Sequence, residues 1–532
     1  MVVPKYTYNN LSKKPNYNYA IPIGIGYVLA SMKKEGYNAD CLNLNHFEGT
    51  IDEILTKKLD SKKYDLVCTG GMALCYSIIE KIIDISKAHI TKPKVIVGGQ
   101  MITSEPELMT KSLNFDIGVI GEGEETIVEL IKCLERNGDL KNVNGLCYKD
   151  ETGNVIITPK RMPVNNLDEL PYPDLESIEF EKTLDNMSCQ DALYGAMDYP
   201  RMYTIFGSRG CPFQCTFCYH NERYRERSVD NIIKEIEFAI KKYKINSFNL
   251  LDDLFSVNKE RLKEFCKKIR KVSQKIEGGL KWRCSLWVGA VDKKTLITLK
   301  NSGCYIIGFG FESYSSEVLR SMKKPITPQQ IDNVIKMCME LKMPIEGNFI
   351  FGDLAETKET AKETLDYWEK NCNGQVKLFF IHPYPGSTLY EICVKRGIIK
   401  DKLDFIKNKI HHTNIINMTE KMTDEEFEWL KKEVYRLKRK YEKYVIPSKI
   451  QKTGNRYELH VKCPFCNGES VFKNCLLQSR PFFVLHTACR KCNMRYFVVS
   501  RLYKFTTDHY VELDFLRKNY LIMRDKFLRK RL

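Results

Sequence analysis

The sequence lacks any apolar run that approaches the roughly 20 residues needed to cross a bilayer as a helix. The apolar run nearest the N-terminus, residues 21–30, follows Lys13 and Lys14 as the core of a signal peptide would. It is short, contains glycines and a proline, and leads into Lys33 and Lys34, so it is better explained as the first helix of a domain. These absences predict a cytoplasmic protein that makes no membrane contact.

Acidic residues are in deficit, with 67 Asp and Glu against 84 Lys and Arg, which gives a formal net charge of +17. An excess of this size favours anionic partners such as nucleotides, phosphates, nucleic acid or an acidic peptide. The alternative is that the surplus lysines are scattered over solvated helix faces, and we favour that explanation for most of them. The charge therefore says little about fold.

The 532 residues are enough for two to four domains, and 43% hydrophobic with 28% charged residues is typical of a globular protein. Twenty cysteines without a secretory signal indicate a reducing compartment, where thiols serve as ligands instead of forming disulfides. Metal-binding cysteines are therefore the first motifs to look for.

Residues 1–140 alternate helical stretches with short apolar strands at 38–44, 66–69, 94–97 and 116–120. Strands separated by helical crossovers predict a Rossmann-like parallel sheet with helices on both faces. Glycines at the carboxyl ends of such strands let a ligand approach the backbone, where open α/β sheets bind ligands. The candidate binding residues are Gly70, Gly71, Gly98, Gly99, Gly121, Glu122 and Gly123. Glu122 also suits the first turn of a helix for dipole reasons alone.

Residues 141–200 read as a linker. A hairpin around Gly153 is predicted for residues 148–157. The stretch 166–174 is predicted to be extended, because the residues before Pro171 and Pro173 avoid the helical conformation.

The loop Cys211-Pro-Phe-Gln-Cys215-Thr-Phe-Cys218 places three thiols within eight residues. Three thiolates can hold three irons of a [4Fe–4S] cluster and leave the fourth iron open to a small molecule. The alternatives are cysteines that merely pack or that bind zinc, but zinc normally needs a fourth ligand that this loop does not supply.

Residues 201–400 again alternate strands with helices, and the first helix after the cysteine loop begins at the cap Ser228. Six βα units predict a partial (β/α)6 barrel whose functional loops lie at the carboxyl ends of the strands. The predicted strands are residues 203–206, 247–251, 282–288, 305–311, 346–351 and 376–382.

The C-x3-C-x2-C spacing, with Phe217 before the last cysteine, resembles the radical S-adenosylmethionine (SAM) superfamily. The resemblance implies that SAM binds the open iron through its amino and carboxylate groups. It also implies that an electron from the cluster, supplied by a donor such as flavodoxin or ferredoxin, cleaves SAM to a 5′-deoxyadenosyl radical.

The same resemblance implies SAM contacts at the strand ends. Asp252 or Asp253 would lie near the SAM amino group or the substrate, and Glu312 with Ser313 would lie where family members bind the ribose and methionine carboxylate. For any single carboxylate, a solvated turn or helix cap is an equally good explanation. The remaining implied contacts, near adenine, are Gly352 and Glu356.

The first domain resembles the cobalamin-binding domain that precedes the radical SAM core in one branch of the superfamily. The matching pieces are Pro22-Ile-Gly24, Val97-Gly98-Gly99, and the turn at residues 121–126. None of the nine histidines lies in an Asp-x-His-x-x-Gly motif, so the resemblance implies a lower cobalt face that is bare or carries water. A plain Rossmann-like domain for another nucleotide is the alternative.

The C-terminal part is predicted as a helical segment (401–454), a zinc-ribbon-like module (455–505) and a basic tail (506–532). Two C-x2-C knuckles can close a tetrahedral zinc site, although redox dithiols or a second cluster are alternatives. The ribbon and tail could grip nucleic acid or an anionic leader peptide, but we favour a docking or structural role. The four cysteines are Cys463, Cys466, Cys489 and Cys492.

We therefore predict an α/β enzyme that combines a Rossmann-like domain, a partial barrel and a zinc ribbon. The resemblance implies a cobalamin-dependent radical SAM enzyme that methylates carbon or phosphorus of a small molecule or peptide. The alternatives are a non-methylating ring closure or rearrangement, and a nucleic-acid-binding protein whose cluster is not catalytic. Neither the substrate nor the oligomeric state follows from the sequence.

Overall fold

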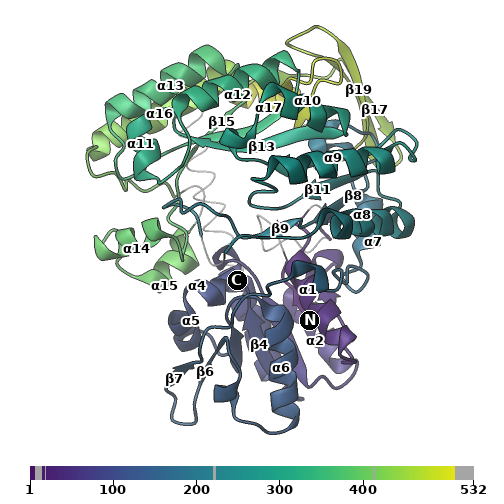
Figure 1. The fold of residues 1–532 in the computed structure, drawn as a ribbon, viewed down its shortest axis with the longest axis vertical. Helices are drawn as coiled ribbons and strands as arrows, with labels where there is room; N and C mark the ends of the chain where they lie inside the picture. Colours follow the sequence, from purple (N-terminus) through teal and green to yellow (C-terminus); the bar gives the residue numbers. More distant parts are fainter. Residues whose placement is uncertain (6–14, 18, 220–222, 411–413, 478, 510–532) are drawn as a thin grey trace.

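The computed structural model of the protein has two α/β parts stacked on one another, with the C-terminal module at the far end of the second (Figure 1). Lys13, Lys14 and the basic tail from residue 510 onward lie outside the residues that the structure describes. The described residues are 1–509 except 6–14, 18, 220–222, 411–413 and 478.

The first part is built on a five-stranded sheet in the order β3-β4-β5-β6-β7. The first three strands run parallel, as the glycine-ended strands predicted. A separate parallel pair, β1 (Val2–Val3) and β2 (Leu42–Asn43), contains only the end of the strand predicted for residues 38–44. The other strands are β3 (Leu66–Gly70), β4 (Lys94–Gly98), β5 (Ile117–Val119), β6 (Leu146–Lys149) and β7 (Val155–Ile157).

The hairpin that we predicted within the linker belongs to this sheet. β6 pairs antiparallel with β5, and β7 pairs antiparallel with β6. The buried residues of β6 continue the apolar face of the sheet, and the hairpin therefore covers the edge of β5 that would otherwise be open. The helices of this part are α1 (Ile23–Lys34), α2 (Ile51–Asp60), α3 (Tyr76–Ala88), α4 (Gln100–Ser104), α5 (Pro106–Ser112) and α6 (Gly123–Glu135).

The second part has a six-stranded, all-parallel sheet in the order β15-β14-β13-β12-β11-β8. All six predicted strands are present, and each is followed by a helix, which is the topology that a partial barrel requires. The strands are β8 (Met202–Ile205), β11 (Ser247–Leu250), β12 (Lys281–Ser285), β13 (Cys304–Glu312), β14 (Ile345–Phe351) and β15 (Lys377–Phe380).

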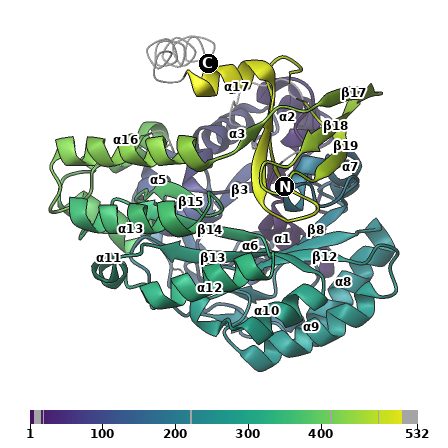
Figure 2. The same cartoon turned by 90° about the horizontal axis from the view of Figure 1, so that it is seen from above.

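Most helices of the second part follow one another along the outside of this sheet (Figure 2), whereas the last of them, Thr388–Lys395, lies beside the first part (Figure 1). Ser228 caps α8 as predicted, since its side chain accepts a hydrogen bond from the backbone N–H of Asn231. The helices are α7 (Phe180–Asn186) in the linker, and then α8 (Val229–Tyr243), α9 (Lys259–Ser273), α10 (Lys293–Asn301), α11 (Ser316–Ser321), α12 (Pro328–Glu340), α13 (Lys358–Asn371) and α14 (Thr388–Lys395).

The segment after residue 400 is less helical than predicted. A short helix, α15 (Lys402–Asp404), runs into a π-helical turn, and residues 414–422 form no helix. Thr419 explains part of this, because its hydroxyl and backbone bond to Asn417 and Met422 in a local turn. The amphipathic helix α16 (Asp424–Tyr441) then begins at a capping box between Thr423 and Glu426.

The C-terminal module contains two three-stranded sheets and helix α17 (Arg501–Asp508). It packs against the amino ends of the second part's strands: Asn493 bonds to Lys342 just before β14, and Arg490 bonds to Asp198 just before β8. The module is therefore at the opposite end of the sheet from the strand ends that carry the predicted site. Its strands are β16 (Tyr444–Val445), β17 (Lys449–Thr453), β18 (Arg456–Lys462), β19 (Glu469–Cys475), β20 (Val484–Ala488) and β21 (Arg495–Val499).

One apolar core joins the two α/β parts. Ile79 and Met101 of the first part pack in the same buried cluster as Leu389, Tyr390 and Phe405 of the second. The two parts thus form one packed unit. Within the described part of the chain, no helix has the length and apolar character needed to cross a bilayer.

Candidate functional site

The cysteine loop is enclosed by a two-stranded antiparallel ribbon. β9 (Ser208–Arg209) enters the loop and β10 (Arg225–Glu226) leaves it, with Arg209 directly opposite Arg225. Cys215 is buried, while Cys218 is exposed and Cys211 half-buried. The three thiols therefore sit in one short loop at the carboxyl end of β8, as expected for ligands of one cluster.

Buried polar groups hold the start of this loop. The Asp252 carboxylate accepts hydrogen bonds from the Gly207 backbone N–H (2.7 Å) and the Ser208 hydroxyl (2.9 Å). Arg261 donates to the Gly207 carbonyl at 2.9 Å. Gly207 has no room for a side chain, because a Cβ would lie 2.8 Å from the Phe255 ring. Burial raises the pKa of Asp252 to about 7.

The far side of the loop is held by segments that follow β13 and β15. The Thr216 N–H donates to the Met322 carbonyl (3.0 Å), and the Leu389 N–H donates to the Thr216 carbonyl (2.8 Å). Gly386, at a φ of +88°, lies under the Tyr219 ring, where a Cβ would come within 2.5 Å. Sequence reasoning missed these supports, because backbone contacts between distant loops leave no motif.

Lys324 is the most informative residue that the sequence did not reveal. Its ammonium pairs with Glu312 at 2.8 Å, and both side chains are largely buried. Burial alone would lower the pKa of Lys324, but Glu312 and the nearby Cys215 together raise it above its usual value. Burial raises the pKa of the Cys215 thiol, which Lys324 opposes. A cation thus faces the thiols that would hold a negatively charged cluster.

A cavity of about 560 Å³ lies between the two α/β parts. One side of the cavity is formed at the carboxyl ends of β3, β4 and β5, and it contains all seven predicted binding residues: Gly70, Gly71, Gly98, Gly99, Gly121, Glu122 and Gly123. The other side includes Phe206, Arg209, Gly210 and Asp253. The predicted ligand-binding face of the first sheet and the residues that lead into the predicted cluster loop therefore line one cavity. No histidine is among the described residues that line it.

The glycines of this cavity have two different reasons to be glycine. Gly24 and Gly121 face open space, since a Cβ at either would meet nothing within 4 Å. Gly70 and Gly99 are required by the protein itself, because a Cβ at Gly70 would lie 2.5 Å from the Gly98 carbonyl oxygen and one at Gly99 2.8 Å from the Gly71 nitrogen. Only the first kind leaves room for a ligand.

Glu122 lines the cavity, but its carboxylate already accepts hydrogen bonds from protein groups. Arg209 and Arg225 donate to it at 2.9 and 2.8 Å, and the Val164 N–H donates at 2.8 Å. Its neighbour Glu124 pairs with Arg209 at 2.5 Å. The acidic residues of this turn therefore face the cluster loop.

The structure places the remaining predicted SAM contacts in different surroundings. Asp253 lines the cavity, whereas Asp252 is buried behind the loop. The Ser313 hydroxyl bonds to Thr364 at 3.2 Å in a turn after β13. The Glu356 carboxylate accepts from the backbone N–H of Gly352 at 2.7 Å, and burial raises its pKa to about 8.

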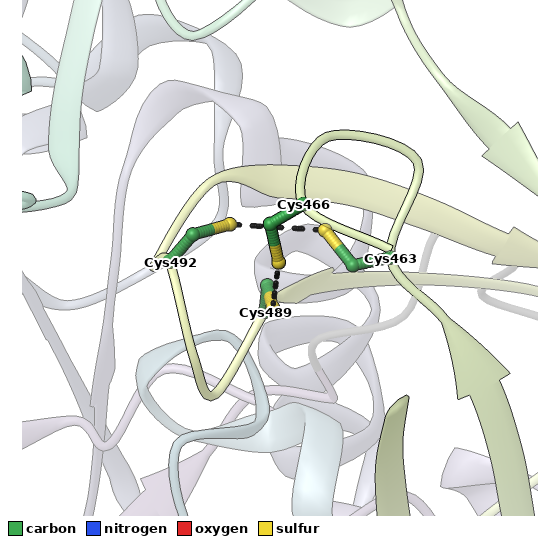
Figure 3. A group of neighbouring side chains, drawn as sticks. All are labelled: Cys463, Cys466, Cys489 and Cys492. Atoms are coloured by element: carbon green, nitrogen blue, oxygen red, sulfur yellow. Dashed lines mark hydrogen bonds between the residues drawn. The ribbon is translucent and has the colours of Figure 1, made fainter. Parts of the chain in front are cut away.

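The four C-terminal cysteines converge from two loops (Figure 3). The sulfur atoms of Cys463 and Cys492, and those of Cys466 and Cys489, lie 3.7 Å apart. All four sulfurs are within 4.8 Å of one another, which is a group that could hold a metal ion. Cys475 lies off this group, beside Cys189 of the linker.

Two family models match the chain: "Radical SAM superfamily" over residues 205–367 and "B12 binding domain" over residues 16–131. A methyltransferase of Pyrococcus horikoshii, itself uncharacterised, is 30% identical over 386 residues, which cover 71% of this chain and 79% of that protein. The chain belongs to the B12-binding branch of the radical SAM superfamily. The predicted membership is confirmed.

Two further comparisons cover a similar share of the chain. Cytidylyl-2-hydroxyethylphosphonate methyltransferase of Streptomyces wedmorensis is 24% identical, over 75% of this chain and 82% of that protein. The structure of the radical SAM methyltransferase TsrM from Kitasatospora setae, with cobalamin and a [4Fe–4S] cluster bound, has a TM-score of 0.58 at 16% identity and covers 74% of each chain. At that identity the likeness shows the fold.

Family membership gives this radical SAM enzyme three cofactors: SAM, a [4Fe–4S] cluster and cobalamin. The residues present fit them. Cys211, Cys215 and Cys218 are the right donors for three irons. The open space at Gly24 and Gly121 is where a large planar ligand could rest on the carboxyl edge of the first sheet.

Proposed function

We propose that this protein transfers a methyl group to carbon or phosphorus of a small-molecule or peptide substrate. The observation that carries the proposal is the shared cavity, because it is lined both by the glycine-ended strands of the B12-binding domain and by Phe206, Arg209 and Gly210, which lead into the cluster loop. A methyl group can pass between two cofactors only if they face the same space. Both curated relatives described above are named methyltransferases, which supports this reaction over others.

The protein's own groups position and shield the reaction. The cluster and SAM supply radical chemistry when bound, and cobalamin supplies a methyl carrier. Cys211, Cys215 and Cys218 would hold the cluster. Asp253 faces the cavity from the strand end after β11, where it could bind the SAM amino group or the substrate. The lining of the cavity is largely apolar and includes Leu251 and Phe206, so it would lower the polarity around the reacting centre.

A ring closure is the second candidate reaction. It is favoured by an anaerobic magnesium-protoporphyrin IX monomethyl ester cyclase of Rubrivivax gelatinosus, which is 26% identical over 70% of this chain and 66% of that protein. Product mass separates the two reactions, because methylation adds one CH2 unit and ring closure adds none. A role confined to nucleic-acid binding is disfavoured, because the radical SAM and B12-binding models that match the chain indicate cofactor chemistry.

We further propose that the C-terminal module is a zinc ribbon with a structural role. Four cysteine sulfurs from two C-x2-C knuckles match the donor set of closed tetrahedral zinc sites. The module contacts the amino ends of the strands, so it supports the second sheet from the end opposite the cavity. Zinc at this site would hold β18 and β19 against β20 and β21.

The test of the proposed function is anaerobic reconstitution with iron, sulfide and hydroxocobalamin, followed by metal analysis and a SAM assay with dithionite. We expect four irons and one cobalt, 5′-deoxyadenosine, and S-adenosylhomocysteine only when cobalamin is bound. Cys215→Ala should abolish 5′-deoxyadenosine formation, whereas the matched control Cys133→Ala, on α6, should retain it. Deoxyadenosine without bound cobalt would refute the methylation proposal.

A further inference from the structure

The turn at residues 121–124 joins the B12-binding domain to the cluster loop through buried ion pairs. Glu122 precedes α6 and Glu124 lies in its first turn, and neither contributes a side-chain cap to that helix. Their partners are Arg209 and Arg225, the two residues that face each other at the base of the cluster loop. We call these four residues the latch.

The latch contains two positive and two negative side chains, and all four are largely shielded from solvent. The side chains of Arg209, Glu122, Glu124 and Arg225 are 17%, 9%, 6% and 5% exposed. Two arginines directly opposite each other on neighbouring strands would repel, and the two carboxylates of the other domain remove that repulsion. The positive charges of Arg209 and Arg225 on the ribbon β9–β10 are therefore neutralised by these carboxylates only when the B12-binding domain is docked against it.

The hydrogen bonds of Glu122 are already used. One oxygen accepts from both arginines, and the other accepts from Arg225 and from the Val164 N–H. A carboxylate has about four acceptor positions, so this one cannot bind a cofactor without releasing a protein group. The cavity wall at Glu122 and Arg209 is thus a fixed surface between the two cofactor sites.

Other contacts between the two parts lie at a different edge of the interface. Gln100 donates to the Pro385 carbonyl at 2.9 Å, and Lys402 pairs with Glu105 at 2.8 Å. These groups follow β4 on one side and β15 on the other, away from β9 and β10. The Gln100 bond lies next to Gly386, which supports the far side of the cluster loop, whereas the latch contacts the ribbon β9–β10 at the base of the loop.

We propose that the latch sets the position of the B12-binding domain relative to the cluster, with Arg209 as its central positioning residue. Arg209 lies two residues before Cys211, and it contacts both carboxylates of the other domain. A change there alters the relation between the two cofactors while the cysteine ligands stay intact. This inference rests on the proposed function, in which both cofactors face one cavity.

The experiment compares reconstituted holoenzymes by a measurement other than activity. The reduced cluster and cob(II)alamin are both paramagnetic, so their dipolar coupling in frozen solution reports the separation between them. We would measure this coupling, the Kd for hydroxocobalamin, and iron and cobalt content in Arg209→Ala, Arg209→Lys, Glu124→Gln and the charge swap Arg209→Glu with Glu124→Arg. The control is Glu129→Gln, which lies on the same helix but pairs with Arg161 outside the latch.

We expect Arg209→Ala and Glu124→Gln to keep four irons, because the three cysteine ligands are unchanged. Their coupling should broaden or vanish, hydroxocobalamin should bind at least tenfold more weakly, and S-adenosylhomocysteine formation should fall at least tenfold. Arg209→Lys or the charge swap should restore part of the coupling. The control should behave as the wild type.

Unchanged coupling and cobalamin affinity in both Arg209→Ala and Glu124→Gln would overturn the inference alone. Wild-type enzyme without bound cobalt would overturn the proposed function and the latch with it. If Arg209→Ala does not fold, the isosteric Glu124→Gln still decides, because it removes the charge and leaves the shape.

Discussion

At the residue scale, two buried carboxyl groups have the same structural role. Asp252 and Glu356 each accept a hydrogen bond from the backbone N–H of a glycine at a strand end, Gly207 and Gly352 respectively. Both are almost fully buried, and burial raises their pKa values to about 7 and about 8. Glu356 is therefore mostly protonated at neutral pH and holds its turn without bringing a charge into the core, whereas Asp252, with a pKa of about 7, is half protonated there.

These raised pKa values make stability fall as pH rises. Between the unfolded pKa near 4 and the folded value near 8, the folded state holds a proton that the unfolded state has lost, so each unit of pH costs up to ~1.4 kcal/mol. Glu356→Gln should therefore flatten the decline of melting temperature between pH 5 and pH 8. Glu363→Gln, on exposed α13 surface, should not. An equal decline of melting temperature between pH 5 and pH 8 in the wild type and Glu356→Gln would contradict this.

Lys324 should tune the cluster. A buried cation beside the cysteine loop favours the reduced, more negative cluster, so Lys324→Met should lower the midpoint potential. We expect a shift of at least ~59 mV, which is a tenfold change for a one-electron couple. Redox titration followed by EPR measures it, at unchanged iron content. The adjacent exposed Lys323→Met is the control, and equal potentials for the two variants would disprove the assignment.

At the scale of elements, much of the positive charge has a local explanation. Arg270 lies in the last turn of α9 and Lys300 in the last turn of α10, where cations stabilise the helix carboxyl ends. Both line a cavity of about 490 Å³ near the C-terminal module. The same cavity is also lined by Lys281 and Lys342, which lie outside these two helix ends.

The C-terminal module should depend on its metal. Cys466→Ala removes one of four converging thiols, so we expect zinc loss and a separate, lower melting transition for β17–β21. Cobalamin content should be unchanged, since the module lies at the opposite end of the second sheet from the cavity. Zinc analysis and the cobalamin absorption spectrum measure both. Retained zinc in Cys466→Ala would count against the site, and Cys338→Ala is the buried-cysteine control.

At the scale of the whole molecule, the two α/β parts share a core. Leu389, fully buried, packs in the cluster that also contains Ile79 and Met101 of the B12-binding domain. Polar contacts such as the latch then act on an interface that apolar packing already closes. Domains that share a core are expected to melt together.

Calorimetry tests this coupling. Leu389→Ala should destabilise the protein by about 2–5 kcal/mol, because it leaves a cavity in the shared core. The transition that releases cobalamin and the transition that releases the cluster should move together. Leu459→Ala, equally buried but in the core of the C-terminal module, should lower a different transition. Independent movement of the cofactor transitions in Leu389→Ala would show that the parts melt separately.

Much of the architecture could be predicted from the sequence. Strand and helix periodicity located all six strands of the second sheet and the Ser228 cap, since these depend on local pattern. The hairpin of β6 and β7 was assigned to the wrong unit, because a local pattern does not say which sheet edge a strand will join. The non-helical stretch at 414–422 was missed, because side-chain bonds of Asn417 and Thr419 override its helical pattern.

By itself, the sequence determined the radical SAM and B12-binding character of this protein and located two C-x2-C pairs, because cysteine spacing and glycine-ended strands are local features. Only the tertiary structure determined which charged groups lie next to one another. It placed Lys324 beside Cys215, turned Asp252 behind the loop and Asp253 into the cavity, and paired Glu122 with Arg209. The physical reason is that burial and ion pairing depend on groups far apart in the chain, and folding is what brings them together.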